Sequence, residues 1–154
     1  MPADLSPHAR NLRAGRFSEA GRSYLITTVT ADRRPLFLDF ATSRLLIQEM
    51  RRCTVEGLAS SLAWVVMPDH LHWLVTLEHG GLARLAKRLK ARSAQAINRQ
   101  HALHGRVWQP GYHDRAVRDE DDVRAMARYI VANPLRAGLV QHMADYPHWD
   151  AIWV

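Results

Sequence analysis

The sequence predicts an α+β domain of the ferredoxin-like type, with two helices on one face of a four-stranded antiparallel sheet. Two observations lead to this prediction. Segments rich in β-branched and aromatic residues alternate with segments whose apolar residues recur every three or four positions. Their order along the chain is β-α-β-β-α-β, followed by one more helix at the C-terminal side. The second face of such a sheet is free for a ligand or for that extra helix.

The first predicted strand covers residues 24–30, where YLITTVT has the composition of a strand. A break around Pro35 follows it. From residue 39 onward, apolar residues recur at helical spacing until Gly57 ends the helix. Either Asp39 or Thr42 can cap the start of this helix, because both side chains accept hydrogen bonds from backbone N–H groups.

Two strands and a second helix come next. Residues 62–67 are apolar on both faces, which is typical of a central strand. A Pro-Asp turn at 68–69 connects them to a strand at 70–77, so the two strands form an antiparallel hairpin in the middle of the sheet. After a glycine pair at 80–81, residues 82–101 carry leucines at helical spacing and predict the second helix.

The last predicted elements are a short strand and a third helix. The strand lies at the end of the segment 107–118. The four acidic residues 119–122 then begin the helix, as expected from the favourable interaction of carboxylates with the helix dipole. An Asn-Pro pair at 133–134 ends it, because the residue before a proline disfavours helical geometry.

The composition bounds the class of protein. The chain has 154 residues, a formal net charge of +6 and a sequence pI near 10.2, and this positive charge favours a polyanionic partner such as nucleic acid. Cys53 is the single cysteine, which excludes an internal disulfide. No apolar run approaches the ~20 residues of a membrane span, and we expect a cytoplasmic protein. The length fits one domain, 1–154, with a basic irregular lead-in at 1–20 and an aromatic tail at 141–154.

His70 and His72 stand at the beginning of the strand at 70–77, beside the turn. Side chains two residues apart in a strand point to the same face, so the two imidazoles project side by side. They can then take two neighbouring positions on one metal ion. Leu71 and Trp73 point to the opposite face, into the core. In a chain with nine histidines, a His-x-His pair is by itself a weak sign of a metal site.

The second helix carries basic residues of almost one sign. Three of them are one turn apart on a single face, namely Arg84, Arg88 and Arg92, with Lys87 beside them. Charges on a helix usually form a solvated face. Because no acidic residue occurs from 82 to 109, we favour a surface that contacts phosphate groups.

The third helix places Tyr129 and Asn133 four residues apart, and therefore on one face. With two histidines on the sheet, they suit phosphoryl transfer to a phenol, in which the tyrosine oxygen attacks a phosphodiester in line and a deoxyribose hydroxyl leaves. An amide oxygen, water and the phosphate would complete an oxygen-rich ligand set suited to Mg²⁺ or Mn²⁺. On chemistry alone, the nucleophile could equally be Tyr24, Tyr112 or Tyr146.

Three segments of the chain together carry a family resemblance. They are MPDHLH at 67–72, VWQPGYHD at 107–114 with Arg118, and RYIVANPLRAGLV at 128–140. The first resembles the HUH motif (His–hydrophobe–His). The last resembles the tyrosine motif of the REP-associated tyrosine transposases, a branch of the HUH single-tyrosine transposases, and the middle segment resembles the one between these two motifs. The order and spacing match over nearly the whole chain.

The resemblance implies a metal-dependent endonuclease and strand transferase for single-stranded DNA, which forms a 5′-phosphotyrosine intermediate near palindromic REP-type hairpins. It implies that His70 and His72 bind Mg²⁺ or Mn²⁺ and that Tyr129, on a C-terminal catalytic helix, is the nucleophile. Asn133 stands where insertion-sequence relatives have a glutamine as third ligand. The resemblance also implies a monomer, although the insertion-sequence relatives form dimers.

Candidate contacts to the DNA hairpin are basic side chains, which can bind phosphate groups, and an aromatic ring that can stack on an extruded base. They are Arg13, Arg16, Arg84, Lys87, Arg88, Arg92, Arg115, Arg118 and Tyr112.

Three alternatives stay open at this point. The first is a non-catalytic protein that binds single-stranded or hairpin nucleic acid through the same surface. The second is an HUH relative that works in replication initiation or conjugation, although such proteins are usually larger. The third is a structural zinc site, for which Cys53 is the single thiol available.

Overall fold

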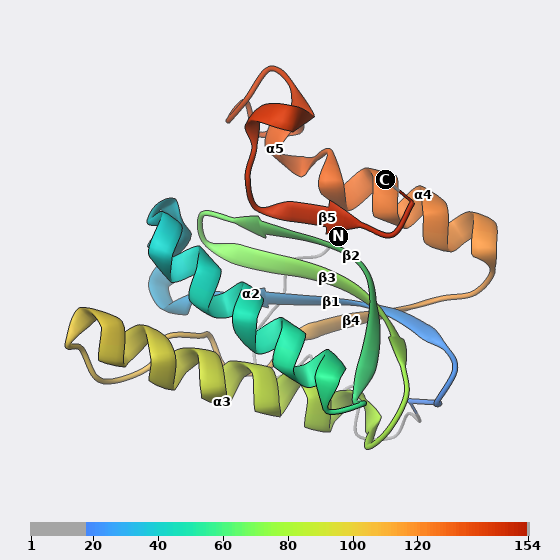
Figure 1. Cartoon of the computed structure of the whole chain (residues 1–154), viewed down its shortest axis with the longest axis horizontal. Helices are drawn as coiled ribbons and strands as arrows, with labels where there is room; N and C mark the ends of the chain where they lie inside the picture. The colour runs from blue at the N-terminus through green and yellow to red at the C-terminus, as the bar shows by residue number, and fades with distance from the viewer. Residues whose placement is uncertain (1–17, 154) are drawn as a thin grey trace.

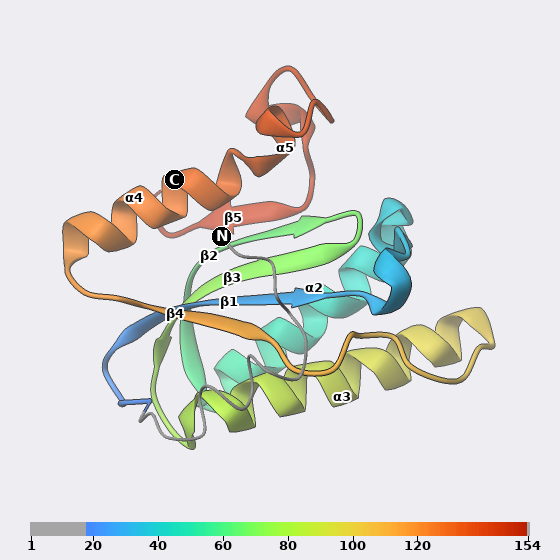
Figure 2. The ribbon, with the colours of Figure 1, turned by 180° about the vertical axis from the view of Figure 1, so that it is seen from behind.

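The computed structural model describes residues 18–153. Its sheet contains five antiparallel strands in the order β4-β1-β3-β2-β5. Helices α2 and α3 lie on one face of the sheet and α4 lies on the other (Figures 1 and 2). The predicted α+β class and ferredoxin-like order are therefore confirmed, with one strand more than the four expected.

The strands are β1 (Ser23–Val29), β2 (Ala59–Met67), β3 (His70–Leu77), β4 (His113–Val117) and β5 (Trp149–Ala151). The α-helices are α2 (Phe40–Val55), α3 (Gly81–His101), α4 (Glu120–Val131) and α5 (Asn133–Arg136). Three short 3-10 helices are η1 (Ala31–Arg33), η2 (Leu36–Leu38) and η3 (Met143–Asp145).

Side-chain caps fix the starts of two helices. The Asp39 carboxylate accepts a hydrogen bond from the Thr42 N–H at 3.1 Å, so Asp39 caps α2 and Thr42 lies in its first turn. The Asp119 carboxylate accepts from the Asp122 N–H at 2.9 Å and caps α4. The acidic segment therefore serves the start of α4, as the helix dipole predicts.

The hairpin of β2 and β3 is buried on both faces. On one face, Leu71 and Trp73 of β3 pack under α2 and α3. On the other face, Leu74 packs with Ile130 of α4. The near-continuous apolar sequence of the two strands is explained by this double coverage. It also means that α4 is held directly over the sheet face that carries the two histidines.

The C-terminal tail supplies the fifth strand. β5 pairs with β2, with Trp149 opposite Val65. The Tyr146 hydroxyl donates a hydrogen bond to the Val66 carbonyl, and the Val66 N–H donates to the His148 carbonyl at 2.9 Å. Tyr146 and Trp149 of the aromatic tail therefore pack against the sheet, whereas Trp153 is 37% exposed. The strand within the tail has only three residues and includes an aspartate, so it lacks the pattern by which a strand is recognised in a sequence.

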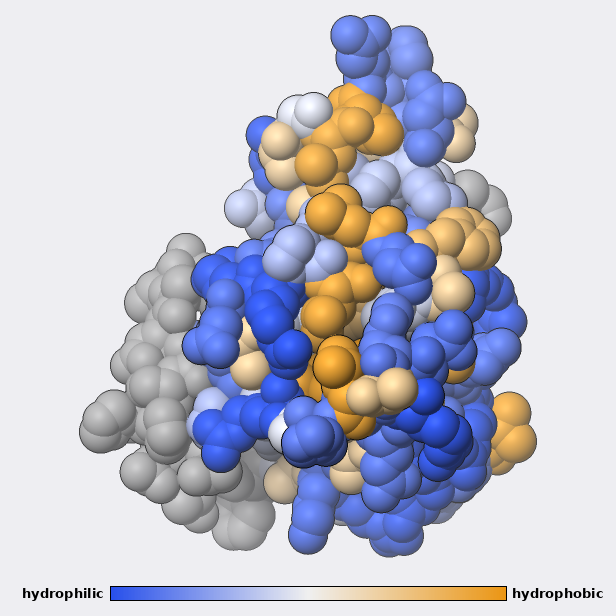
Figure 3. Space-filling model, turned by 90° about the vertical axis from the view of Figure 1, so that its left-hand side faces the viewer, coloured by the Kyte–Doolittle hydropathy of each residue, from blue (hydrophilic) through white to orange (hydrophobic). Residues whose placement is uncertain are grey.

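One end of the molecule combines the β2–β3 turn with exposed apolar side chains. Figure 3 shows a band of hydrophobic residues running down this end, with hydrophilic residues on both sides. Large exposed hydrophobic residues of the chain include Leu38 at the end of η2, Phe40 at the start of α2 and Leu139 after α5. Among the residues that the structure describes, no helix is both long and apolar enough to cross a membrane.

Candidate active site

A groove of about 1140 Å³ separates α4 from the β1, β3 and β4 strands below it. Thr27 and His72 line its floor, and Tyr129 lines its wall on α4. Asn133, the first residue of α5, and Asp114 of β4 complete this part of the lining. The fold thus brings one predicted histidine, the predicted tyrosine and the predicted asparagine to a single hollow, although about sixty residues separate them in the sequence.

His70 and His72 lie next to each other on the α4 face of the sheet. Their ring centroids are 4.8 Å apart, and the ring planes cross at 79°. Both side chains are half-buried. The alternation of β3 places them on the face opposite Leu71 and Trp73, as the sequence predicts.

Each histidine is hydrogen-bonded through Nδ1. His72 Nδ1 lies 2.7 Å from the Thr27 hydroxyl, because the antiparallel register sets Thr27 of β1 directly opposite His72 of β3. His70 Nδ1 donates to the Asp69 carboxylate at 2.7 Å. In both rings Nε2 is then the nitrogen that a metal would bind, and a partner on Nδ1 fixes the ring orientation.

The electrostatic environment keeps His72 neutral. Burial is the largest cause that lowers the pKa of His72 to about 3, and the nearby charges of His70 and Arg136 act in the same direction. A neutral imidazole is the form that binds a metal. Burial acts to raise the pKa of Asp69, but its hydrogen bond from His70 and the ion pair with Arg33 outweigh burial and leave that pKa lowered. Asp69 therefore stays ionised beside His70.

Tyr129 and Asn133 are joined by a residue that the sequence analysis did not single out. Tyr129 is 62% exposed on α4. The Arg136 guanidinium carbon lies 3.9 Å from the centroid of the Tyr129 ring, and Arg136 Nη2 donates to Asn133 Oδ1 at 3.2 Å. The positions 129, 133 and 136 have the i, i+4, i+7 spacing of one helix face, and this spacing could have identified Arg136.

The available donor atoms fit a divalent ion that also takes oxygen ligands. Within residues 18–153, no group of three or more His, Cys, Asp or Glu side chains could hold a metal ion. The candidate metal ligands are the Nε2 atoms of the two imidazoles, whose Nδ1 atoms already have partners, and the Asn133 amide oxygen. They form an incomplete ligand set. Such a set leaves positions for water and phosphate oxygens, as Mg²⁺ and Mn²⁺ sites usually do.

Comparison with known proteins decides the family. The family model described as "Transposase IS200 like" matches residues 20–133, which include both histidines, Tyr129 and Asn133. The chain belongs to the IS200-like transposase family. The predicted resemblance to its REP-associated branch is also confirmed, by the relatives described next.

Three relatives show the branch that this transposase resembles. A REP-associated tyrosine transposase of Escherichia coli K12 is 31% identical over 87 residues, which are 55% of this chain and 50% of that protein. The match thus spans about half of the E. coli protein. A Haemophilus influenzae protein considered to be of the same type is 25% identical over 83% of this chain and 78% of its own length. A solved REP-associated tyrosine transposase bound to a REP hairpin has a TM-score of 0.73 at 25% identity, covering 87% of this chain and 79% of that one.

The basic side chains predicted to contact DNA are divided between the two faces of this transposase. Arg115 and Arg118 line the groove. The residues of α3 lie on the opposite face, and two of them are paired: Arg92 makes two bonds to the Glu56 carboxylate, at 2.7 and 2.8 Å, and Arg88 approaches it at 3.4 Å. Arg84 and Lys87 are exposed. The predicted basic face of α3 is thus partly neutralised by an acid from the end of α2.

Two further predictions concern Tyr112 and the N-terminal arginines. Tyr112 is only 7% exposed and packs in the core under α2 and α3, so its ring is covered and cannot stack on a base in this conformation. Trp108 is buried in the same core. Arg13 and Arg16 lie outside the described residues.

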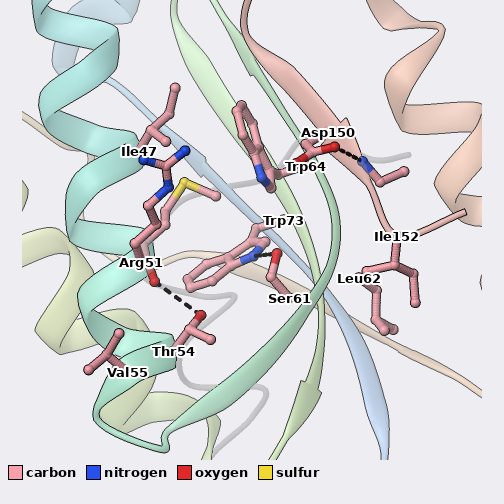
Figure 4. Close-up of a pocket in the computed structure, with 12 residues that line it drawn as sticks. Ile47, Arg51, Thr54, Val55, Ser61, Leu62, Trp64, Trp73, Asp150 and Ile152 are labelled. Atoms are coloured by element: carbon pink, nitrogen blue, oxygen red, sulfur yellow. Dashed lines mark hydrogen bonds between the residues drawn. The ribbon is translucent and has the colours of Figure 1, made fainter. Parts of the chain in front are cut away.

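A second hollow, of about 370 Å³, lies between α2 and the β2–β5 edge of the sheet (Figure 4). Ile47 of α2 and Trp64 of β2 are among its mainly apolar lining residues. Several of its polar groups are engaged with neighbours: Trp73 Nε1 donates to the Ser61 hydroxyl at 2.9 Å, and the Thr54 hydroxyl donates to the Met50 carbonyl at 3.3 Å. The groove under α4 therefore remains the candidate active site.

Proposed function

We propose that this transposase cleaves and rejoins single-stranded DNA through a covalent link to Tyr129. The observation that supports the proposal is the lining of one groove by Tyr129, Asn133 and His72, which come from α4, α5 and β3. Membership of a transposase family supports the same reaction class. The high exposure of Tyr129 leaves its hydroxyl accessible to a polymeric substrate.

The proposed step is a transesterification. The Tyr129 oxygen attacks the phosphorus of a phosphodiester in line, a bond forms between them, and the bond from phosphorus to the 3′ oxygen breaks. The phenol proton is lost to solvent, and the departing 3′ oxygen takes up a proton. The DNA keeps its 5′ phosphate on Tyr129. Because one phosphoester replaces another, reversal of the step rejoins a strand without a nucleotide cofactor.

The residues proposed to hold a divalent ion, Mg²⁺ or Mn²⁺, are His70 and His72 through Nε2 and Asn133 through Oδ1. When bound, such an ion supplies charge neutralisation at the phosphate. The Thr27 hydroxyl and the Asp69 carboxylate hold the two imidazole rings in the required orientation. Asn133 has a shorter side chain than glutamine, and it is placed at the groove because α5 starts at this residue.

The proposed substrate is DNA with a palindromic hairpin, bound by the protein as a monomer. A structural neighbour of this chain is a REP-associated transposase bound to a REP hairpin, which supports such a substrate. The net charge of +6 supports a nucleic-acid partner. Arg115 and Arg118 line the groove, and we expect them to contact the strand that reaches Tyr129.

The test is the formation of a covalent adduct. The protein is incubated with labelled single-stranded DNA carrying a palindrome, with Mn²⁺ or Mg²⁺, and analysed on a denaturing gel. We expect an adduct with the wild type and none with Tyr129→Phe, whereas Phe at 24, 112 or 146 should preserve it. An adduct that persists in Tyr129→Phe would refute this nucleophile. Tight binding by the wild type without any adduct would instead identify a non-catalytic nucleic-acid-binding protein.

A further inference from the structure

Arg136 lies in direct contact with the ring of the proposed nucleophile, Tyr129. Its guanidinium lies over the Tyr129 ring at 3.9 Å, which is the geometry of a cation–π contact. The same group donates to Asn133 Oδ1 at 3.2 Å. One planar side chain thus touches both the proposed nucleophile and the proposed amide ligand.

The backbone explains why these residues form one stripe. Ala132 links α4 to α5, and its carbonyl accepts hydrogen bonds from the N–H groups of Leu135 and Arg136 at 3.0 and 3.1 Å. The helical path therefore continues past Pro134, which stands at the start of α5 where its missing N–H costs no hydrogen bond. Two turns of helix then separate Tyr129 from Arg136, so the arginine reaches back along the same face.

The charge of Arg136 has no acidic partner in the described part of the chain. Within residues 18–153, no carboxylate lies at ion-pair distance from Arg136, in contrast to Arg92 or Arg33. The side chain is exposed, and its guanidinium has five N–H donors, of which one bonds to Asn133. An exposed guanidinium with no acidic partner among the described residues, next to the groove residues Tyr129 and Asn133, is suited to bind phosphate through two parallel hydrogen bonds.

We propose that Arg136 binds a non-bridging oxygen of the phosphodiester that Tyr129 attacks, while its contact with the ring holds the tyrosine oxygen in line with the phosphorus. The inference rests on the proposed function and adds a substrate-binding residue to it. The guanidinium neither gains nor loses a proton in the step. It offsets the negative charge that builds on the phosphate oxygens as the tyrosine–phosphorus bond forms and the bond to the 3′ oxygen breaks.

A substrate with a neutral phosphate tests the contact directly. The cleavage site is mapped from the wild-type adduct, and the same DNA is made with a methylphosphonate there, which lacks the charged oxygen. We expect Arg136→Gln to slow adduct formation by about 100-fold on the phosphodiester and by no more than about threefold on the methylphosphonate. Arg136→Lys should recover part of the loss on the phosphodiester, because it keeps the charge but not the planar fork.

The matched control is Arg128→Gln, which removes the same charge next to Tyr129 from a side chain that does not lie over the ring. It should slow the two substrates by the same factor. An equal slowing of both substrates by Arg136→Gln, or no slowing of either, would overturn the inference and leave the proposed function intact. Failure of the wild type to form any adduct would overturn the proposed function itself, and the inference with it.

A binding measurement without cleavage distinguishes loss of the proposed contact between Arg136 and phosphate from a general loss of folding. In a Tyr129→Phe background, which keeps the ring under Arg136, the protein should bind the phosphodiester DNA several-fold more tightly than the methylphosphonate DNA. Adding Arg136→Gln should abolish that preference while the melting temperature stays unchanged. The proposed contact would be contradicted if the protein with Arg136→Gln still preferred the phosphodiester DNA. It would also be contradicted if the Tyr129→Phe protein showed no such preference.

Discussion

At the scale of single residues, a comparison of Thr27 with Thr28 tests one hydrogen bond of the site, because the hydroxyls of these two residues lie on opposite faces of β1. The Thr27 hydroxyl lies on the groove side of β1 and contacts His72 Nδ1 at 2.7 Å. The neighbouring Thr28 points to the other face, where its buried hydroxyl has no hydrogen-bond partner among the described residues. Both side chains are buried, so replacement by valine changes little volume in either case. The two substitutions therefore separate ring orientation from packing.

We predict that Thr27→Val lowers the affinity for Mn²⁺ by about 10-fold, because His72 loses the partner that orients its ring. Isothermal titration calorimetry of the DNA-free protein measures this without any catalytic step. Thr28→Val should keep the wild-type affinity and should unfold at the same or a higher temperature, since it removes an unsatisfied buried hydroxyl. Equal Mn²⁺ affinities of wild type and Thr27→Val would contradict the orienting role of Thr27.

At the scale of elements, Glu56 connects two helices that the sequence shows only as separate segments. It is the residue that ends α2, and its carboxylate binds Arg92 and Arg88 of α3. The hydrogen bond from Arg92 is the largest cause that lowers the pKa of Glu56 to about 2. The contact thus ties the end of α2 to the middle of α3 and removes positive charge from the face that α3 turns to solvent.

We predict that the Glu56 contact stabilises the fold above about pH 4.5 and is lost as the pH falls towards 2. The sign follows from the lowered pKa in the folded state, since the unfolded carboxyl takes up its proton first as the solution is acidified. Thermal melts from pH 2 to 6 should show a smaller acid-induced decrease for Glu56→Gln than for the wild type. Glu49→Gln, which removes a pair within α2, is the control and should keep the wild-type slope. Parallel curves for all three proteins would refute the prediction.

The same substitution tests whether the α3 face binds DNA. Glu56→Gln releases the charges of Arg88 and Arg92, so the affinity for single-stranded DNA should rise and its salt dependence should become steeper. Fluorescence anisotropy at several salt concentrations measures both quantities. If α3 is only a solvated face, affinity and slope will match those of Glu49→Gln, and the DNA-contact role predicted for α3 will be wrong.

At the scale of the whole molecule, the sequence predicted the elements that have strong periodicity and missed what depends on their assembly. Alternation in β3 placed His70 and His72 on one face, and helical spacing placed Tyr129 with Asn133. The neutralisation of α3 by Glu56 and the burial of Tyr112 arise from tertiary packing, which local patterns do not encode. Arg136 is an intermediate case. Its helical spacing from Tyr129 and Asn133 is visible in the sequence, but its contact with the Tyr129 ring requires the helical path to continue past Pro134.

The fifth strand has a role that only the assembled sheet makes visible. Without β5, β2 would be the edge of the sheet, with a row of unpaired backbone groups available to another chain. β5 covers this edge through the pairing of Trp149 with Val65, and Trp149 Nε1 donates to the Met143 carbonyl at 3.1 Å. Trp149 and Tyr146 also pack against the core that holds α4 over the sheet. The tail therefore both protects an edge and supports the helix that carries Tyr129.

We predict that truncation after residue 146 produces a protein that unfolds at a lower temperature and self-associates in proportion to its concentration. The exposed edge of β2 accounts for the association, and the loss of the Trp149 packing accounts for the lower stability, by about 1–3 kcal/mol. Thermal melts and light scattering on size-exclusion fractions measure the two effects. Ile152→Ala is the matched control, because Ile152 is 62% exposed and follows β5. The Ile152→Ala protein should remain monomeric and close to wild-type stability. A truncated protein that stays monomeric at high concentration would show that β5 is not needed to protect this edge.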